Sequence, residues 1–386
     1  MKTVYFDHAA TTPVEKRVLD KMLPYFTSQF GNANSAHQFG RDCKVAIEDA
    51  REEIAALLGA EPSEIIFTSG GTESDNAIIK GVVNATRKKE IITSPIEHHA
   101  VIHPAEFLKM TGCRVTYLTP DSRGQIDPEE LKETISDDTA VVSLMHVNNE
   151  IGSINPIREL AEVCRSKNVT FHTDAVQSVG KLPVNVKELG VDALSVSAHK
   201  IHGPKGIGLL YVKNGTPWIP WLQGGSQERR RRGGTTNVAG VVGMAEALRI
   251  SIEEQKEMMN HYKTLRETAI SELDKRFGEL YQINGPAEDG MPNILNIGFK
   301  TDAEGGLDGE MLLLNLDIDG ICVSNGSACT SGAMEPSHVL EGIGVSSAVA
   351  NSSIRISFGK QNRVEEVHYF ADKLEQILHR MMKTTA

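Results

Sequence analysis

The sequence predicts an α/β protein, with a large domain built on a mostly parallel, seven-stranded sheet and a small α+β domain toward the C-terminus. Two observations favour this fold class. The chain has 386 residues, beyond the size at which a single hydrophobic core usually stops growing. Between about residues 60 and 212, short β-rich apolar runs alternate with helical patterns, as in a parallel sheet covered by helices.

Seven apolar runs predict the strands of the large domain. In chain order they are "EIIFTSG" (64–70), "EIITSP" (90–95), "RVTYLT" (114–119), "AVVSLMHV" (140–147), "VTFHTDA" (169–175), "ALSVSA" (193–198) and "IGLLYV" (207–212). Helices are predicted between them at 73–83, 127–135 and 156–167, where apolar residues recur at the helical period. Asp127 suits the N-cap of the second of these helices.

Further helices and strands are predicted on both sides of this region. Apolar residues from Cys43 to Leu58 keep a helical period, and Gly59 suits the position after a helix end. Residues 237–280 have a helical pattern and are expected to connect the domains. Short runs between 293 and 359, followed by an amphipathic helix at 364–382, fit a small α+β domain. We expect the large domain at 13–255 and the small domain at 1–12 and 256–386.

Composition narrows the class of protein. Hydrophobic residues make up 40% and charged residues 24% of the chain, as in ordinary soluble proteins, and the net charge of −11 argues against non-specific binding to nucleic acids or anionic membranes. No apolar signal region or membrane-length apolar run is visible, so we expect a cytoplasmic location. The five cysteines contain no C-x-x-C pair, which favours reduced thiols over disulfides or structural zinc.

Polar residues follow five of the predicted strands at their carboxyl ends, the edge at which open α/β sheets place their active sites. The five clusters are Ser69–Glu73, Glu97–His99, His146–Glu150, Asp174 with Gln177, and Ser197–Lys200. One such cluster would be unremarkable by itself, but five at the same edge are hard to explain by chance. The sequence therefore predicts one functional site at this edge.

Lys200 is the reactive group that this site suggests. It lies where a strand ends, in "SAHKIHGPKG", and burial there would lower the pKa of its amine and make it a nucleophile toward carbonyls. A surface lysine is the simpler alternative. Gly71 and Thr72 follow a strand and open a helix, so their amides can hold a phosphate. Ser197 and His199 can add side-chain donors.

Two further residues complete a recognisable set. Asp174 is placed to keep a ring nitrogen protonated, and His98 can stack on a flat ring. A phosphate cradle, a carboxylate, an aromatic platform and a Schiff-base lysine are the protein parts that pyridoxal 5′-phosphate requires. Simpler interpretations remain: Thr72 as a helix cap, Asp174 as a strand-end carboxylate, or His98, His99 and His103 as metal ligands, although the last lack a matching carboxylate or cysteine set.

With these residues in place, the sequence resembles the pyridoxal-phosphate-dependent cysteine desulfurases of the nitrogen-fixation and iron–sulfur-assembly type over essentially its whole length. The matching stretches are "YFDHAATTP", "GNANSAH", "TSGGTESDNAIIKG", "EHHAV", "HVNNEIG", "HTDAVQS", "SAHKIHGPKGIG", "GGSQERRRRGGT", "SNGSACTSG" and "SSIRISFG". The resemblance implies a fold-type I enzyme that is a homodimer. It also implies conversion of L-cysteine to L-alanine, with the sulfur left as a persulfide on an enzyme cysteine.

The resemblance assigns roles position by position. Lys200 becomes the Schiff-base lysine, Asp174 the partner of the ring nitrogen, and His98 the stacking residue. The remaining cofactor contacts that it implies are Gly71, Thr72, Ser197 and His199 at the phosphate, Gln177 at the phenolic oxygen, and Thr235 at the phosphate of the neighbouring subunit. Asn149 and Arg355 would hold the substrate carboxylate. Arg355 in a structural ion pair is the alternative, and Arg229–Arg232 form either a subunit interface, a nucleic-acid patch or a solvated charge run.

Cys329 becomes the sulfur acceptor. It lies in "SNGSACTSGAMEPS" (324–337), where glycines, serines and a proline disfavour regular structure. An acceptor on such a loop can touch the substrate and then present sulfur to a scaffold or carrier protein, for iron–sulfur cluster assembly or other thio-compounds. The rival interpretations are another fold-type I enzyme, such as an aminotransferase or selenocysteine lyase, and a non-catalytic scaffold that keeps the fold.

Overall fold

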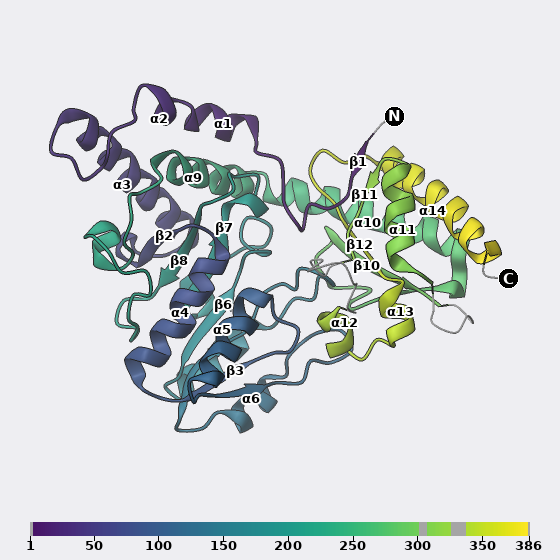
Figure 1. Cartoon of the computed structure of the whole chain (residues 1–386), viewed down its shortest axis with the longest axis horizontal. Helices are drawn as coiled ribbons and strands as arrows, with labels where there is room; N and C mark the ends of the chain where they lie inside the picture. The colour runs from purple at the N-terminus through teal and green to yellow at the C-terminus, as the bar shows by residue number, and fades with distance from the viewer. Residues whose placement is uncertain (1–2, 301–306, 326–336, 385–386) are drawn as a thin grey trace.

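The computed structural model describes residues 3–300, 307–325 and 337–384 and has two units (Figure 1). The larger unit is built on the seven predicted strands: β2 (Ile65–Thr68), β3 (Glu90–Thr93), β4 (Arg114–Tyr117), β5 (Thr139–Ser143), β6 (Thr170–Asp174), β7 (Ala193–Ser197) and β8 (Gly208–Val212). Their order in the sheet is β2-β8-β7-β6-β5-β3-β4. Only β8 runs antiparallel to its neighbours, which confirms the mostly parallel seven-stranded sheet.

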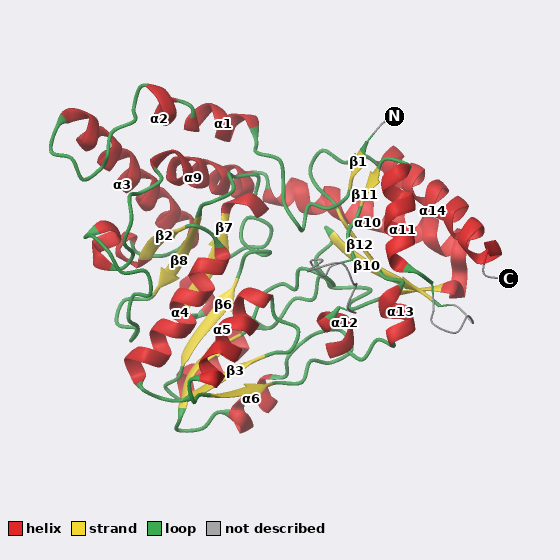
Figure 2. Cartoon of the chain, in the orientation of Figure 1, coloured by secondary structure: helices red, strands yellow, loops and turns green. Residues whose placement is uncertain are grey.

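Helices cover both faces of this sheet because alternate strand residues point to opposite sides. Ile65 and Phe67 belong to a core with α3 (Gln38–Leu58), α7 (Ile157–Ser166) and α9 (Val238–Glu253). Ile66 belongs to a second core with α4 (Gly71–Thr86) and α5 (His99–Met110). The larger unit is therefore a three-layer sandwich, with α4 and α5 in front of the strands in Figure 2.

Several helix ends follow the predicted chemistry. Helix α3 ends at Gly59, whose φ of 72° is left-handed and favours glycine. Helix α6 (Pro128–Thr134) begins after Asp127, whose carboxylate accepts a hydrogen bond from the amide of Glu129. The predicted helical connection is also present, divided at Glu254 into α9 and α10 (Gln255–Phe277).

The smaller unit packs helices on a separate sheet. Strands β9 (Tyr281–Ile283), β10 (Ile294–Phe299) and β12 (Ile354–Ser357) form it in the antiparallel order β12-β10-β9. Strand β1 (Val4–Tyr5) pairs in parallel with β11 (Ile321–Cys322), so the start of the chain lies against its C-terminal part. The sequence analysis identified neither β1 nor β9 as a strand.

The other helices complete the two units. They are α1 (Lys16–Met22), α2 (Pro24–Thr27), α8 (Val186–Leu189), α11 (Gly309–Ile318), α12 (His338–Gly342), α13 (Ser347–Asn351), α14 (Val364–Thr384) and the short 3₁₀ turns Pro62–Glu64, Ala198–Lys200, Gln227–Arg230 and Gly278–Leu280. Helices α10, α11 and α14 surround the core of the smaller unit. Over the described ranges, none of the helices combines the length and apolar character needed to cross a bilayer.

Candidate active site

A cavity of about 680 Å³ opens where the strands of the large sheet end. Its lining includes ten of the residues that the sequence singled out: Gly71, Thr72, His98, Asn149, Asp174, Gln177, Ser197, His199, Lys200 and Arg355. They come from the ends of β2, β3, β5, β6 and β7 and, across the cavity, from β12 of the smaller unit. The five polar clusters thus meet at one place, between the two units.

Lys200 lies on a 3₁₀ turn directly after β7. Its Nζ donates hydrogen bonds to the carbonyl oxygens of Ala9, at 2.5 Å, and Ala10, at 2.8 Å. Burial and the nearby Arg355 lower the pKa of Lys200 to about 8, although Asp174 opposes the shift. The amine is therefore far more often neutral near pH 7–8 than that of a surface lysine, and a neutral amine is the nucleophilic form.

Asp174 is the last residue of β6 and is buried. One carboxylate oxygen accepts a hydrogen bond from the amide of Val176 at 2.9 Å. Burial raises the pKa of Asp174 to about 6, while Val176 and the positive charge of Lys200 act against this rise. Two further buried carboxyls, Asp75 and Glu97, have a pKa raised well above the usual range by burial and by the Asp174 charge. A protonated ring nitrogen would give Asp174 a counter-charge.

His98 is the N-cap of α5, and its Nδ1 accepts a hydrogen bond from the amide of Ala100 at 3.1 Å. Burial and the positive charge of Lys200 lower the pKa of His98 to about 4, so the ring is neutral at physiological pH. The neighbouring ring of His99 stacks on His103 with centroids 4.7 Å apart. Among the residues with described positions, no group of three or more potential ligands is arranged to hold a metal ion.

The part of the cavity wall around the start of α4 offers hydrogen-bond donors for a phosphate. Gly71 begins α4, whose N-terminus faces the cavity, and a Cβ at this position would approach the side chain of Val176 within 2.8 Å. Ser197 and His199 face the same end from β7 and the turn after it. Burial lowers the pKa of His199 to about 4, and its Nδ1 lies 3.1 Å from the hydroxyl of Thr11.

Arg355 reaches the cavity from β12 but already has partners there. One terminal nitrogen, Nη2, pairs with Asp7 at 2.7 Å, and Nη1 donates to the carbonyl of Asn149 at 3.0 Å. The buried Nε atom of Arg355 has no partner among the residues that the structure describes. The ion pair foreseen as the alternative role of Arg355 is therefore present, and a substrate carboxylate would share this guanidinium with Asp7.

The surroundings of Gln177 and Gly71 indicate whether the cavity suits pyridoxal phosphate. The Nε2 atom of Gln177 donates to the carbonyl of Ala9 at 2.9 Å, and the buried Oε1 of Gln177 has no partner in the described part of the chain. Contact with a phenolic oxygen would require this nitrogen to exchange Ala9 for the cofactor. The unpartnered Gln177 amide oxygen, the space left by the missing Cβ of Gly71, and the carboxylate and amine in the lining fit the cofactor.

Two predicted residues are not among those that line this cavity. Thr235 is exposed and does not line it, and Cys329 lies outside the described residues. Other residues at the site were missed by the sequence analysis: Asp7, and the Ala9 and Ala10 carbonyls, belong to an N-terminal segment whose residues are chemically ordinary. Only the matched stretch "YFDHAATTP" pointed to them.

The loop before Thr235 has an unusual backbone. Three consecutive non-glycine residues, Glu228, Arg229 and Arg230, have positive φ angles of 44°, 56° and 66°, a conformation that side chains other than glycine rarely adopt. The buried carboxylate of Glu228 accepts two hydrogen bonds from Arg51, at 2.8 and 3.0 Å, and one from the amide of Phe67 at 3.0 Å. This buried carboxylate holds the turn against β2.

Two arginines of the segment Arg229–Arg232 form ion pairs with glutamates of the same chain. Arg232 pairs with Glu73 through two hydrogen bonds of 2.8 and 3.0 Å, and Glu73 accepts from the amide of Ser69 at 2.7 Å. Arg229 pairs with Glu48 at 3.1 Å on the surface. The loop is therefore tied to the same β2–α4 turn that opens the phosphate end of the cavity.

Comparison with known proteins is consistent across sequence and structure. Residues 4–370 match the family model of the class-V aminotransferases. A cysteine desulfurase IscS from Dictyoglomus turgidum is 48% identical over 98% of this chain and 95% of its own length, and another from Methanosarcina thermophila is 45% identical over 98% and 93%.

Solved structures give the same result. A NifS-like protein superimposes with a TM-score of 0.91 at 42% identity, covering 98% of this chain and 100% of its own. A structure of SspA in complex with cysteine superimposes with a TM-score of 0.80 at 36% identity, covering 92% and 99%. This chain therefore belongs to the class-V aminotransferase family of fold-type I proteins and, within it, to the pyridoxal-phosphate-dependent cysteine desulfurases.

Proposed function

We propose that this enzyme transfers the sulfur of L-cysteine to Cys329 as a persulfide and releases L-alanine, with Lys200 as the Schiff-base lysine. The observation that carries the proposal is the position of the Lys200 amine. It shares one cavity with the carboxylate of Asp174, the guanidinium of Arg355 and the N-terminus of α4, and both charged groups are close enough to shift its pKa. This lining can hold the cofactor and the substrate carboxylate beside one amine.

When bound, pyridoxal phosphate supplies an electron sink that makes the Cα proton of cysteine acidic. Lys200 then accepts this proton at Nζ, and its lowered pKa keeps enough neutral amine available. Asp174 would hold the ring nitrogen of the cofactor in its charged form, and the neutral ring of His98 would stack on the cofactor. Arg355 and Asn149 would orient the substrate carboxylate, and Gly71, Thr72, Ser197 and His199 would hold the phosphate.

The sulfur step balances without an external oxidant or reductant. The Cys329 thiolate attacks the substrate sulfur, the Cβ–S bond breaks with its electron pair retained on carbon, and a proton completes alanine. The four other cysteines are poor candidates. Cys43 and Cys164 are buried, and burial raises the pKa of Cys113, Cys164 and Cys322. Their thiolate, the nucleophilic form, is therefore scarce.

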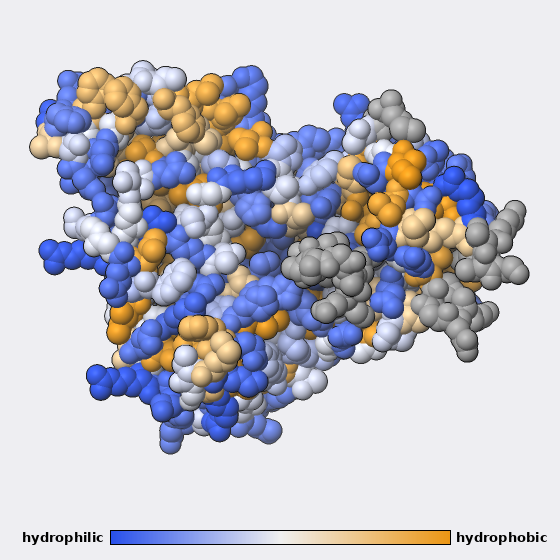
Figure 3. All heavy atoms as spheres, in the orientation of Figure 1, coloured by the Kyte–Doolittle hydropathy of each residue, from blue (hydrophilic) through white to orange (hydrophobic). Residues whose placement is uncertain are grey.

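A homodimer would complete each site. Thr235 is exposed and does not line the cavity of its own chain, and we propose that it contacts the phosphate bound by the neighbouring subunit. Large apolar side chains are also exposed on and around α1, α2 and α3, and Figure 3 shows part of this surface over α1 and α2. The exposed residues are Leu19, Leu23, Phe26, Phe30, Phe39 and Val45. A second copy of the chain covering them would explain their exposure.

The persulfide requires a recipient. IscS relatives carry the name of cysteine desulfurases, and we propose that this enzyme also passes its sulfur to a scaffold or carrier protein, for iron–sulfur cluster assembly or another thio-compound. We further propose a cytoplasmic location, and functional domains at residues 13–255 and at residues 1–12 with 256–386. Such a division places Lys200 and Cys329 on different domains.

Replacement of Cys329 by serine tests the sulfur acceptor. Because a hydroxyl is a far poorer nucleophile toward sulfur, Cys329→Ser should bind pyridoxal phosphate normally but lose alanine production, whereas Cys113→Ser should keep it. Mass spectrometry of the wild type after exposure to cysteine should find one extra sulfur on the peptide that contains Cys329. Sustained alanine formation by Cys329→Ser would refute the proposal, and stoichiometric keto-acid formation would favour an aminotransferase.

A further inference from the structure

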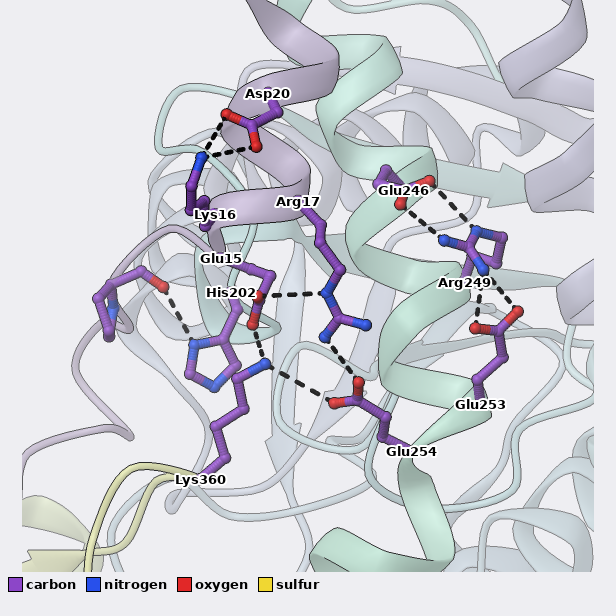
Figure 4. A network of polar contacts seen from close by, with 11 residues as sticks. Glu15, Lys16, Arg17, Asp20, His202, Glu246, Arg249, Glu253, Glu254 and Lys360 are labelled. Carbon is purple, nitrogen blue, oxygen red and sulfur yellow. Dashed lines mark hydrogen bonds and ion pairs between the residues drawn. The ribbon is translucent and has the colours of Figure 1, made fainter.

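A second, smaller cavity of about 40 Å³ is lined by Lys200 and lies beside the main one. Polar residues from several distant segments line it: His8, Glu15, Lys181, His202, Glu254, Asn293 and Lys360. Figure 4 shows part of its wall, where Lys360 points toward Glu15 and Glu254 and the ring of His202 lies beside them. Lys200 therefore lines two cavities, and the proposed function uses only the larger one.

Two atoms at this small cavity lack the hydrogen bonds that buried polar groups normally make. The side chains of His8 and Asn293 are buried, with residue exposures of 6% and 1%. Within the described ranges, Nδ1 of His8 and Oδ1 of Asn293 have no hydrogen-bond partner. A polar cavity holds water when its volume exceeds about 10–15 Å³ and it offers two to four polar partners. The small cavity meets both conditions, since its volume of about 40 Å³ has space for about two or three water molecules and its lining is polar.

Lys181 is one of the titratable groups in this lining that the proposed mechanism does not use. Its Nζ donates one hydrogen bond, to the carbonyl of Gln177 at 3.2 Å. Burial, together with the positive charge of Lys200, lowers the pKa of Lys181 to about 7. Because the pKa of Lys200 is about 8, a proton can pass between the two amines at little cost in free energy.

We propose that the small cavity contains ordered water linking Lys200 to Lys181, and that Lys181 is the group through which Lys200 exchanges protons with solvent. The inference rests on the proposed role of Lys200 as the base. The ammonium of Lys200 gives a proton to the water chain, and the neutral amine of Lys181 takes one from it. Charge and atoms balance, and no electrons move between the groups.

The remaining wall of the cavity sets the local charge. The titratable groups that face it, besides the two lysines, are His8 after β1, Glu15 before α1, His202 after the 3₁₀ turn, Glu254 between α9 and α10, Tyr262 on α10 and Lys360 after β12. The carboxylates of Glu15 and Glu254 are paired with Lys360 and Arg17. Burial lowers the pKa of His8 to about 4 and lowers that of His202, so both rings are neutral near pH 7. Lys181 is thus the group in this wall poised to exchange protons at neutral pH.

Three variants of the holoenzyme separate the charge of Lys181 from its ability to exchange a proton. Lys181→Met removes both, Lys181→Arg keeps only the charge, and Ala247→Val narrows the cavity while leaving Lys181 in place, since Ala247 also lines it. Lys187→Met is the matched control, because Lys187 is an exposed lysine paired with Glu61 on the surface. Borohydride fixation of the cofactor to Lys200 in the wild type checks the proposed function independently.

The first measurement is the pH titration of the visible absorption band of the bound cofactor. Removal of a nearby amine that is positively charged for part of the titration should raise its midpoint by up to roughly one pH unit in Lys181→Met, whereas Lys181→Arg should not raise it, and Ala247→Val and the control should titrate like the wild type. The second is the isotope at Cα of alanine formed from ordinary cysteine in D₂O. Slower exchange of the Lys200 proton should at least double the proportion of original hydrogen retained in all three variants, but not in the control.

A crystal structure of the holoenzyme provides the direct test. Water within hydrogen-bond distance of Lys181 Nζ and His8 Nδ1 would support the proposal, and a dry cavity would overturn it. Unchanged hydrogen retention in Lys181→Met and Ala247→Val would overturn the role of Lys181 even if water is present. Failure of borohydride to fix the cofactor to Lys200 would instead overturn the proposed function.

Discussion

Replacement of Arg51 by methionine should destabilise the enzyme far more than replacement of a nearby surface arginine. The side chains of Arg51 and Glu228 are 3% and 5% exposed, so the mutation leaves a buried carboxylate without its counter-charge. Removal of one partner from such a pair costs about 3–5 kcal/mol. Phe67 still donates its amide to Glu228, and methionine keeps apolar contact with the Phe67 ring, so we expect a loss of about 3 kcal/mol.

Arg229→Met is the matched comparison because it removes an ion pair from the same loop. Arg229 and Glu48 are 45% and 39% exposed, and surface pairs of this kind contribute about 0–1 kcal/mol. Urea unfolding of both variants, followed by the fluorescence of Trp218 and Trp221 at one protein concentration, measures the difference. The effect of Arg51→Met should persist in about 1 M salt, since buried pairs are screened little. Losses within about 1 kcal/mol of each other would refute the assignment of Glu228 as the anchor of the turn.

Four other outcomes are expected. Asp174→Asn should bind the cofactor but lower kcat about 10²–10³-fold, because it removes a fixed charge from the site; activity within tenfold of wild type would contradict its role. Arg355→Lys should raise the KM for cysteine at least about tenfold with a smaller effect on kcat, because lysine lacks the planar guanidinium that binds a carboxylate through two hydrogen bonds. An unchanged KM would mean that Arg355 serves only in the ion pair with Asp7. The pKa of Lys200 falls from 10.5 to about 8 on folding, so the unfolded chain binds more protons between these two values and the stability of the apo enzyme rises with pH there. Calorimetry should therefore find apo Lys200→Met more stable than apo wild type at pH 7, and this difference should shrink above pH 8. A difference that does not depend on pH would contradict the shift in pKa. Heterodimers of Lys200→Ala and Thr235→Val chains should regain activity at one intact site, and activity no higher than that of either parent would rule out action of Thr235 across the interface.

The strands and the chemistry at their ends were predictable because both are local. Most strands lie in short runs that contain apolar and β-branched residues, and a parallel sheet brings the following polar residues to one edge whatever the order of the strands. For this reason Lys200, Asp174 and His98 were identified from their positions alone. Helix ends such as Gly59 and Asp127 were predictable for a similar reason, since a cap depends on residues within one turn.

The parts that the sequence did not reveal depend on contacts between distant segments. Strand β1 has two residues, too few to show any periodicity, and it forms only because β11 is available as a partner. The carbonyls of Ala9 and Ala10 carry no chemical signature, yet they are the hydrogen-bond acceptors of Lys200. Asp7 was likewise not predicted as the partner of Arg355 in an ion pair, because the two residues lie at opposite ends of the chain.

The N-terminal segment also links completion of the cavity to synthesis of the C-terminal part of the chain. Val4 pairs with Ile321, and Phe6 accepts a hydrogen bond from the amide of Ser357 at 2.7 Å. A nascent chain therefore emerges with its first residues unpartnered, and they wait for segments made more than 300 residues later. Ala9 and Ala10, whose carbonyls accept hydrogen bonds from Lys200, line the cavity together with Arg355. The wall around the Lys200 amine is therefore complete only after the chain has been synthesised beyond Arg355.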